Sequence, residues 1–212
     1  MEWLSELASE RPALLAKYIC YALIAVIVVV AICLSLSGCK VKTPSNEKNS
    51  SSYKELAELL ITDKTALKNV NTCFTDYKKY YDTHQAQYED RGIENADEPE
   101  TIMWFAIVDC LLENNLAVEV DWQEEPAAVA DLLNNTIKND TLKIDPEWFL
   151  SEDLTECFEV INSKWKGQNT VLAAIDIDSD SYVLVALKTE QFEKAKKLAE
   201  DIERNIDFAN NL

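Results

Sequence analysis

Apolar residues in the middle of the chain recur at alternating spacings of three and four positions. Between residues 67 and 88 they are Leu67, Val70, Phe74, Tyr77, Tyr81, His84 and Tyr88. This spacing predicts one long helix, starting near residue 62, with a single apolar face that we call the 67–88 seam. Such a face packs within the chain or against a second copy, so a homo-oligomer through the seam is one interpretation. His84, inside the seam, is expected to be a packed core residue.

Helical and strand patterns then follow one another along the chain. Residues 101–115 are apolar almost all round, which predicts a central, buried helix. Residues 116–122 alternate apolar and polar side chains, which predicts a half-buried strand. Two apolar strands over 171–177 and 182–187 are joined by a turn at 178–181. Further helices are predicted over 53–61 with Ser52 as cap, over 126–135, between the cap Ser151 and the stop Gly167, and over 189–206.

These elements predict an α+β fold, with a small, mainly antiparallel sheet of about three strands packed by several helices. The hairpin strands are apolar on both faces, so we expect both faces of the sheet to be covered. Asp109 and Glu113 share the one polar face of the central helix and are expected to be solvated. The tryptophans at positions 104, 122, 148 and 165 fall at core or turn positions, where core packing is expected.

An uncharged segment precedes this domain. Residues 18–38 contain no charged side chain, and as a helix they would span about 30 Å of hydrocarbon. The segment ends Leu36-Ser37-Gly38-Cys39, which resembles the lipobox of bacterial lipoproteins. That resemblance implies that Cys39 becomes the lipidated N-terminus of the mature chain. Because acidic residues outnumber basic ones before the segment, unlike in a usual signal peptide, an uncleaved membrane anchor is the alternative.

The predicted organisation therefore has four parts. They are an N-terminal segment (1–17), an apolar membrane-spanning or signal helix (18–38), the lipobox cysteine with a flexible Ser/Asn/Lys-rich linker (39–52), and an acidic α+β domain (53–212). Both interpretations of the apolar segment tie the domain to a membrane. The predicted location is the bacterial cell envelope, with the domain outside the cytoplasm.

Charge and glycine content narrow the range of functions. The net charge is −18, which argues against nucleic acid as a partner and leaves a self-repelling soluble surface, a basic protein partner or cations. The chain has three glycines, far apart, so it lacks the glycine-rich loop that cradles phosphates in nucleotide-binding proteins.

Aspartates gather around the predicted hairpin. Asp176, Asp178 and Asp180 alternate at its tip, and Asp121 would approach Asp176 if the first strand pairs beside the hairpin. Oxygen ligands at this spacing suit Ca²⁺, so these four aspartates form a candidate cation site, with a solvated turn as the other interpretation. No other cofactor is expected.

Catalytic signals are few. The predicted domain contains three cysteines, Cys73, Cys110 and Cys157, and one histidine. Cys110 and Cys157 fall on apolar helix faces, where a thiol acts as a small hydrophobe. In an oxidising compartment two of the three could form a disulfide. The sequence leans away from an enzyme and nominates no catalytic residue.

Three short motifs carry a resemblance to a family. They are Trp104-x4-Asp109, Glu119-Val120-Asp121-Trp122 and Ile175-Asp176-x3-Asp180-Ser181-Tyr182. Together they resemble an uncharacterised bacterial domain-of-unknown-function family over about residues 100–205. The resemblance implies an α+β fold and a bacterial source, and it brings no known activity.

The sequence thus favours a membrane-tethered, non-enzymatic interaction domain of the cell envelope. One alternative is an acidic immunity-type protein that binds a basic toxin. Another is a cation- or small-ligand-binding domain that uses the aspartate cluster.

Overall fold

The computed structural model describes residues 44–212. The predicted apolar segment 18–38 and Cys39 lie outside the described residues. Across the part that is described, no helix is both long enough and apolar enough to span a membrane.

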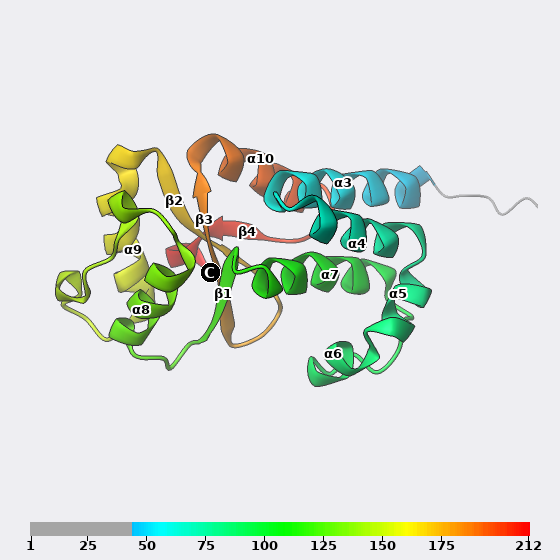
Figure 1. Cartoon of the computed structure of the whole chain (residues 1–212), viewed down its shortest axis with the longest axis horizontal. Coiled ribbons are helices and arrows are strands. Elements are labelled where there is room, and N and C mark those ends of the chain that lie inside the picture. The colour runs from blue at the N-terminus through cyan, green and yellow to red at the C-terminus, as the bar shows by residue number, and fades with distance from the viewer. Residues whose placement is uncertain (1–43) are drawn as a thin grey trace, which may run out of the picture. The chain divides into compact units, whose positions relative to one another are not determined.

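The described chain folds into helices around a four-stranded antiparallel sheet with the strand order β1-β3-β2-β4 (Figure 1). The strands are β1 (Ala117–Asp121), β2 (Thr170–Ile175), β3 (Ser181–Lys188) and β4 (Ile206–Phe208). The longer helices are α3 (Pro44–Leu60), α4 (Lys64–Thr75), α7 (Pro99–Glu113), α8 (Pro126–Thr136), α9 (Leu154–Trp165) and α10 (Thr189–Glu200), and two short ones are α5 (Tyr77–Thr83) and α6 (Gln85–Asp90). The predicted α+β class with an antiparallel sheet is confirmed.

Helices cover both faces of the sheet, as expected from its apolar strands. Along β2, Val171, Ala173 and Ile175 face the core shared with α3, α4, α7 and α10. Leu172 and Ala174 face a second core, shared with α8 and α9 on the opposite side (Figure 1). Side chains alternate between faces along a strand, so one fully buried strand supplies both cores.

The central helix predicted for residues 101–115 is α7. Its side chains from Ile102 to Val108 are all buried. Trp104 has 1% of its surface exposed, and its Nε1 donates a hydrogen bond to the carbonyl oxygen of Asp176 at 2.8 Å. This bond satisfies the polar end of a buried indole and ties α7 to the loop after β2.

The prediction of a single long helix for the 67–88 seam is wrong, because the helical backbone is interrupted at two residues. Asp76 (φ −149°, ψ 78°) separates α4 from α5, and His84 (φ −122°, ψ 21°) separates α5 from α6. The Asp76 carboxylate accepts a hydrogen bond from the backbone N–H of Lys79 and so caps α5. A three-four spacing is equally compatible with short helices that turn around α7, which is what the chain forms.

The seam nevertheless faces the core. Val70, Tyr81 and Tyr88 are buried in the same core as α7. His84 is half-buried at the second break; its ring stacks on Tyr80 at 4.0 Å between centroids, and its Nδ1 lies 2.9 Å from the Tyr80 carbonyl oxygen. The seam is therefore packed within the chain.

The first helix begins earlier than predicted. α3 starts at Pro44, so residues 44–52 of the predicted flexible linker are helical, and Ser52 is buried within the helix and does not cap it. Tyr53, Leu56 and Ala57 are fully buried in the core. Once such side chains fix a helix, each further residue adds a hydrogen bond at low cost, so polar residues before them join it.

Other local differences reflect turn chemistry. Asp153, and not Ser151, caps α9, with Oδ1 accepting hydrogen bonds from the backbone N–H groups of Thr155 and Glu156. The left-handed residue after this helix is Asn169 (φ 50°) and not Gly167. The last helix ends at Glu200, and the chain then forms β4, the fourth strand that the predicted three-stranded sheet lacked.

Trp122 is the exception among the tryptophans expected in the core. β1 ends one residue earlier, at Asp121, so the indole stands beyond the sheet with 54% of its surface exposed.

Candidate functional site

The aspartates predicted to bind a cation lie in two places. Asp176 follows β2, and its carboxylate accepts a hydrogen bond from the backbone N–H of Asp178 at 2.9 Å. The Asp178 carboxylate in turn pairs with Arg204 at 3.3 Å. Both aspartates line a small pocket with Glu203 and Arg204.

The other two aspartates lie at the β1–β3 edge. Asp121 is paired with Ser181 in the register of the strands, and its carboxylate accepts from the backbone N–H of Gln123. Asp180 lines a different pocket, next to Trp122. Within residues 44–212, no group of three or more His, Cys, Asp or Glu side chains is arranged to hold a metal ion. Calcium binding stays a prediction.

The cysteines of the described region are free and buried. Burial raises the pKa of the Cys73 thiol to about 12 and that of Cys110 to about 11, the latter with help from Glu113. The thiolate is the nucleophile, so thiols with such pKa values are poorly reactive at neutral pH.

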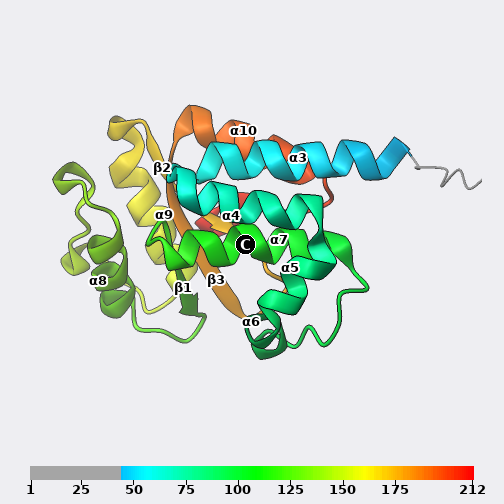
Figure 2. The same cartoon turned by 45° about the vertical axis from the view of Figure 1, so that its right-hand side comes forward.

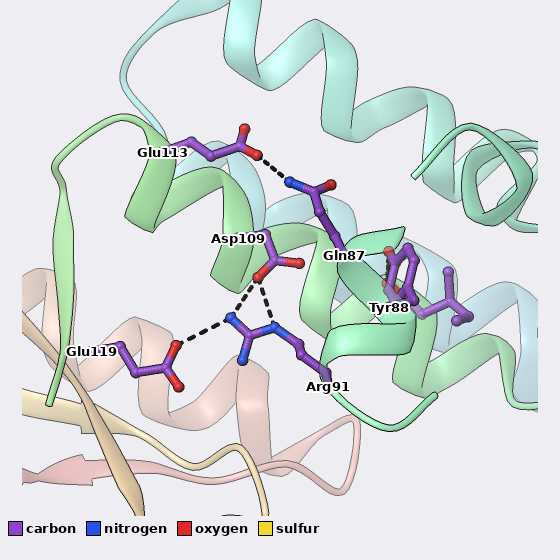
Figure 3. A network of polar contacts seen from close by, with 7 residues as sticks. Gln87, Tyr88, Arg91, Asp109, Glu113 and Glu119 are labelled. Atoms are coloured by element: carbon purple, nitrogen blue, oxygen red, sulfur yellow. Dashed lines mark hydrogen bonds and ion pairs between the residues drawn. The ribbon is translucent and has the colours of Figure 1, made fainter. Parts of the chain in front are cut away.

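A network of charged side chains that the sequence did not single out lies between α6, α7 and β1 (Figure 3). Its centre is Arg91, the residue that ends α6. The next residue, Gly92, has φ 77°, and the backbone N–H of Ile93 donates to the Tyr88 carbonyl. This is the Schellman turn, which needs a residue at positive φ and so favours glycine there.

The Arg91 guanidinium bridges two carboxylates. Its Nε and Nη2 lie 2.9 and 2.6 Å from Oδ1 of Asp109, and Nη2 also lies 3.2 Å from Oε2 of Glu119. The guanidinium carbon is 4.9 Å from the centre of the Phe105 ring, which is cation–π distance. The side chains of Arg91 and Asp109 are 18% and 16% exposed, so the pair is mostly removed from water.

Negative charge exceeds positive charge in this network. Glu113, one turn after Asp109 on α7, accepts a hydrogen bond from Gln87 at 2.6 Å (Figure 3). Burial raises the pKa of Asp109, and Glu113 and Glu119 raise it further, which together outweigh the opposite effect of Arg91. We call Asp109, Glu113 and Glu119 the acidic triad; one guanidinium neutralises only part of its charge.

The expectation that Asp109 is solvated is wrong, because Arg91 covers it. The sequence did contain a sign of this ion pair: Asp109 is a charged residue on a mostly apolar helix, and Arg91 precedes Gly92 at the end of another helix. The partners are 18 and 28 positions apart along the chain, however, and only the tertiary fold selects them.

Comparison with known proteins gives a family and no activity. No curated protein and no solved structure matches the chain. Residues 52–209 match the family described as Domain of unknown function (DUF6630), a longer stretch than the three motifs covered. The expected membership of an uncharacterised family is confirmed, and the chain belongs to the DUF6630 family.

Proposed function

We propose that this protein is a membrane-tethered, non-enzymatic interaction domain of the bacterial cell envelope, and that its acidic triad binds a basic segment of a partner protein. The observation that carries the proposal is that two carboxylates, Asp109 and Glu119, share one guanidinium at a partly buried place, while the third, Glu113, adds negative charge beside Asp109 without contacting Arg91. The lipobox-like sequence and the uncharged segment before it support the tether.

The electrostatics favour a further cation at the triad. The raised pKa of Asp109 means that its charged form lacks full compensation from solvent and Arg91. A lysine or arginine side chain brought close by a partner would supply that compensation. Glu113 and Glu119 are exposed, so such a side chain can reach them.

The reactive side chains of the described region support a binding role over catalysis. Its thiols are buried and have raised pKa values. His84 is stacked on Tyr80 and held against that residue's backbone carbonyl. The thiols of residues 44–212 are therefore poor nucleophiles at neutral pH, and His84 Nδ1, which also lies 3.0 Å from the Thr83 hydroxyl, is engaged by neighbouring groups.

Neutralising two carboxylates of the triad should weaken binding of a basic peptide. We expect the variant Glu113→Gln/Glu119→Gln, which keeps the Arg91–Asp109 pair, to bind a fluorescent lysine-rich peptide about tenfold more weakly. Fluorescence anisotropy with the full chain in nonionic detergent measures the Kd. The control, Glu193→Gln/Glu200→Gln on the exposed side of α10, changes the net charge equally and should stay within about twofold. Equal weakening in the two variants would reject the triad as the binding site.

The tether makes a separate prediction about the mature chain. Intact-mass analysis of protein purified from membranes should give a chain that starts at Cys39 and carries a diacylglyceryl group. A full-length mass from the membrane fraction would favour the uncleaved anchor. Full-length protein in the soluble fraction would contradict both forms of the tether.

A further inference from the structure

The break in the 67–88 seam opens a groove between α4 and α5. Its volume is about 600 Å³, within the range of small-molecule sites. α5 turns away from the axis of α4 after Asp76 (Figures 1 and 2), so side chains that would share a flat face of one long helix line a concave surface. Most of them belong to the helix faces beside the seam; Tyr80, which also lines the groove, is buried in the core.

The groove carries positive charge on a strongly negative protein. The charged side chains that line it are Lys68, Lys79 and Asp76. The Asp76 carboxylate already accepts the hydrogen bond that caps α5. Two lysines with one partly engaged carboxylate suit an anion, and lysine binds phosphate as a point charge.

The uncharged polar groups of the groove offer acceptors. The hydroxyl of Thr75 donates to the backbone carbonyl of Asn71 at 3.1 Å, which leaves its two lone pairs available. The hydroxyl of Thr83 donates to the Tyr80 carbonyl at 2.9 Å and also lies 3.0 Å from Nδ1 of His84, so at least one of its two lone pairs stays available. The Asn71 Oδ1 is buried and has no hydrogen-bond partner within the described chain. Asn71 lines the groove while this oxygen is buried, so a half-turn of the amide, which exchanges its oxygen and nitrogen, is needed before a donor in the groove can reach the oxygen.

We propose that this groove binds a phosphorylated sugar. The phosphate monoester lies between Lys68 and Lys79, and sugar hydroxyls donate to Thr75, Thr83 and Asn71. Inorganic phosphate has the charge but lacks the hydroxyl-bearing ring, and a free sugar lacks the charge. The proposal goes beyond the binding of a basic partner and uses no residue of the acidic triad.

Isothermal titration calorimetry of the full chain in nonionic detergent tests the proposal with glucose 6-phosphate as the probe. We expect saturable binding that Lys68→Gln/Lys79→Gln weakens roughly tenfold, because both charge-assisted contacts are lost. Lys194→Gln/Lys197→Gln, on exposed positions of α10, makes the same charge change and should alter the affinity less than about twofold.

Three further probes separate the contribution of the phosphate from that of the sugar hydroxyls and from binding of a lipid headgroup. Glucose and inorganic phosphate should each bind more weakly than glucose 6-phosphate, and equal binding of phosphate would overturn the sugar contacts. Glycerophosphoglycerol, the deacylated headgroup of phosphatidylglycerol, is a singly charged diester; tighter binding of this compound would assign the groove to lipid headgroups and overturn the proposal. The absence of heat with all four probes overturns it as well, as does binding unaffected by the double lysine variant.

Asn71 provides a test that separates binding from folding. Asn71→Leu removes a buried acceptor that has no partner, so the melting temperature should be unchanged or higher. The affinity for glucose 6-phosphate should fall several-fold, because a sugar hydroxyl loses its acceptor. A lower melting temperature with unchanged affinity would make Asn71 a structural residue and overturn its place in the site.

Discussion

Trp104→Ala should lower the free energy of unfolding by about 4 kcal/mol. The indole is 1% exposed in the core between α7 and the sheet, so its loss leaves a cavity. The substitution also removes the hydrogen bond to the Asp176 carbonyl, which ties α7 to the loop after β2. Urea unfolding followed by circular dichroism measures the change in the free energy of unfolding. If the variant does not fold, the milder Trp104→Phe should also lower this free energy, by a smaller amount.

Trp122→Ala is the matched control, because the same side chain is removed where 54% of it is exposed. Its effect should stay within about 0.5 kcal/mol. A loss as large as that of Trp104→Ala would mean that Trp122 packs in the core, contrary to the structure.

Arg91→Ala should lower the free energy of unfolding by about 3 kcal/mol. It leaves Asp109, which is 16% exposed, and Glu119 without their shared counter-charge, and it removes the contact with Phe105. The stability lost in this variant should shrink as the pH falls. The pKa of Asp109 is already raised and should rise further without Arg91. Lowering the pH therefore protonates this carboxyl first, which removes the unpaired charge. Urea unfolding at neutral and acidic pH measures both effects.

Lys194→Ala removes the cation of an exposed pair with Glu190 and serves as the control for Arg91. Exposed pairs contribute little, so its effect should be below about 0.5 kcal/mol. Arg91→Ala/Asp109→Asn should recover part of the stability, since the uncompensated charge is gone. A double variant as unstable as the sum of the two single variants would show that the pair is not coupled.

The sequence pattern predicts an element correctly where neighbouring residues alone determine its structure. The apolar residues of α7, the turn between β2 and β3 and the proline that opens α8 each predict their element within a few positions. The covered sheet also followed from its strands, because apolar side chains on both faces of β2 and β3 leave neither face for solvent.

Long-range contacts decided the rest. The break at Asp76 leaves the spacing of the seam intact, so periodicity alone does not reveal it. β4 has three residues and continues the apolar spacing of α10, which hides the change from helix to strand. The sequence does not reveal the partners of Arg91, since they lie on α7 and β1.

The inward-facing seam has a consequence for self-association. Val70, Tyr81 and Tyr88 already fill the core of their own chain, so a second copy can reach them only after α4 to α6 leave α7. Dimerisation through these side chains would therefore be an exchange of helices between protomers. It would be slow and coupled to local unfolding, and the products would be domain-swapped dimers, not two folded domains resting face to face.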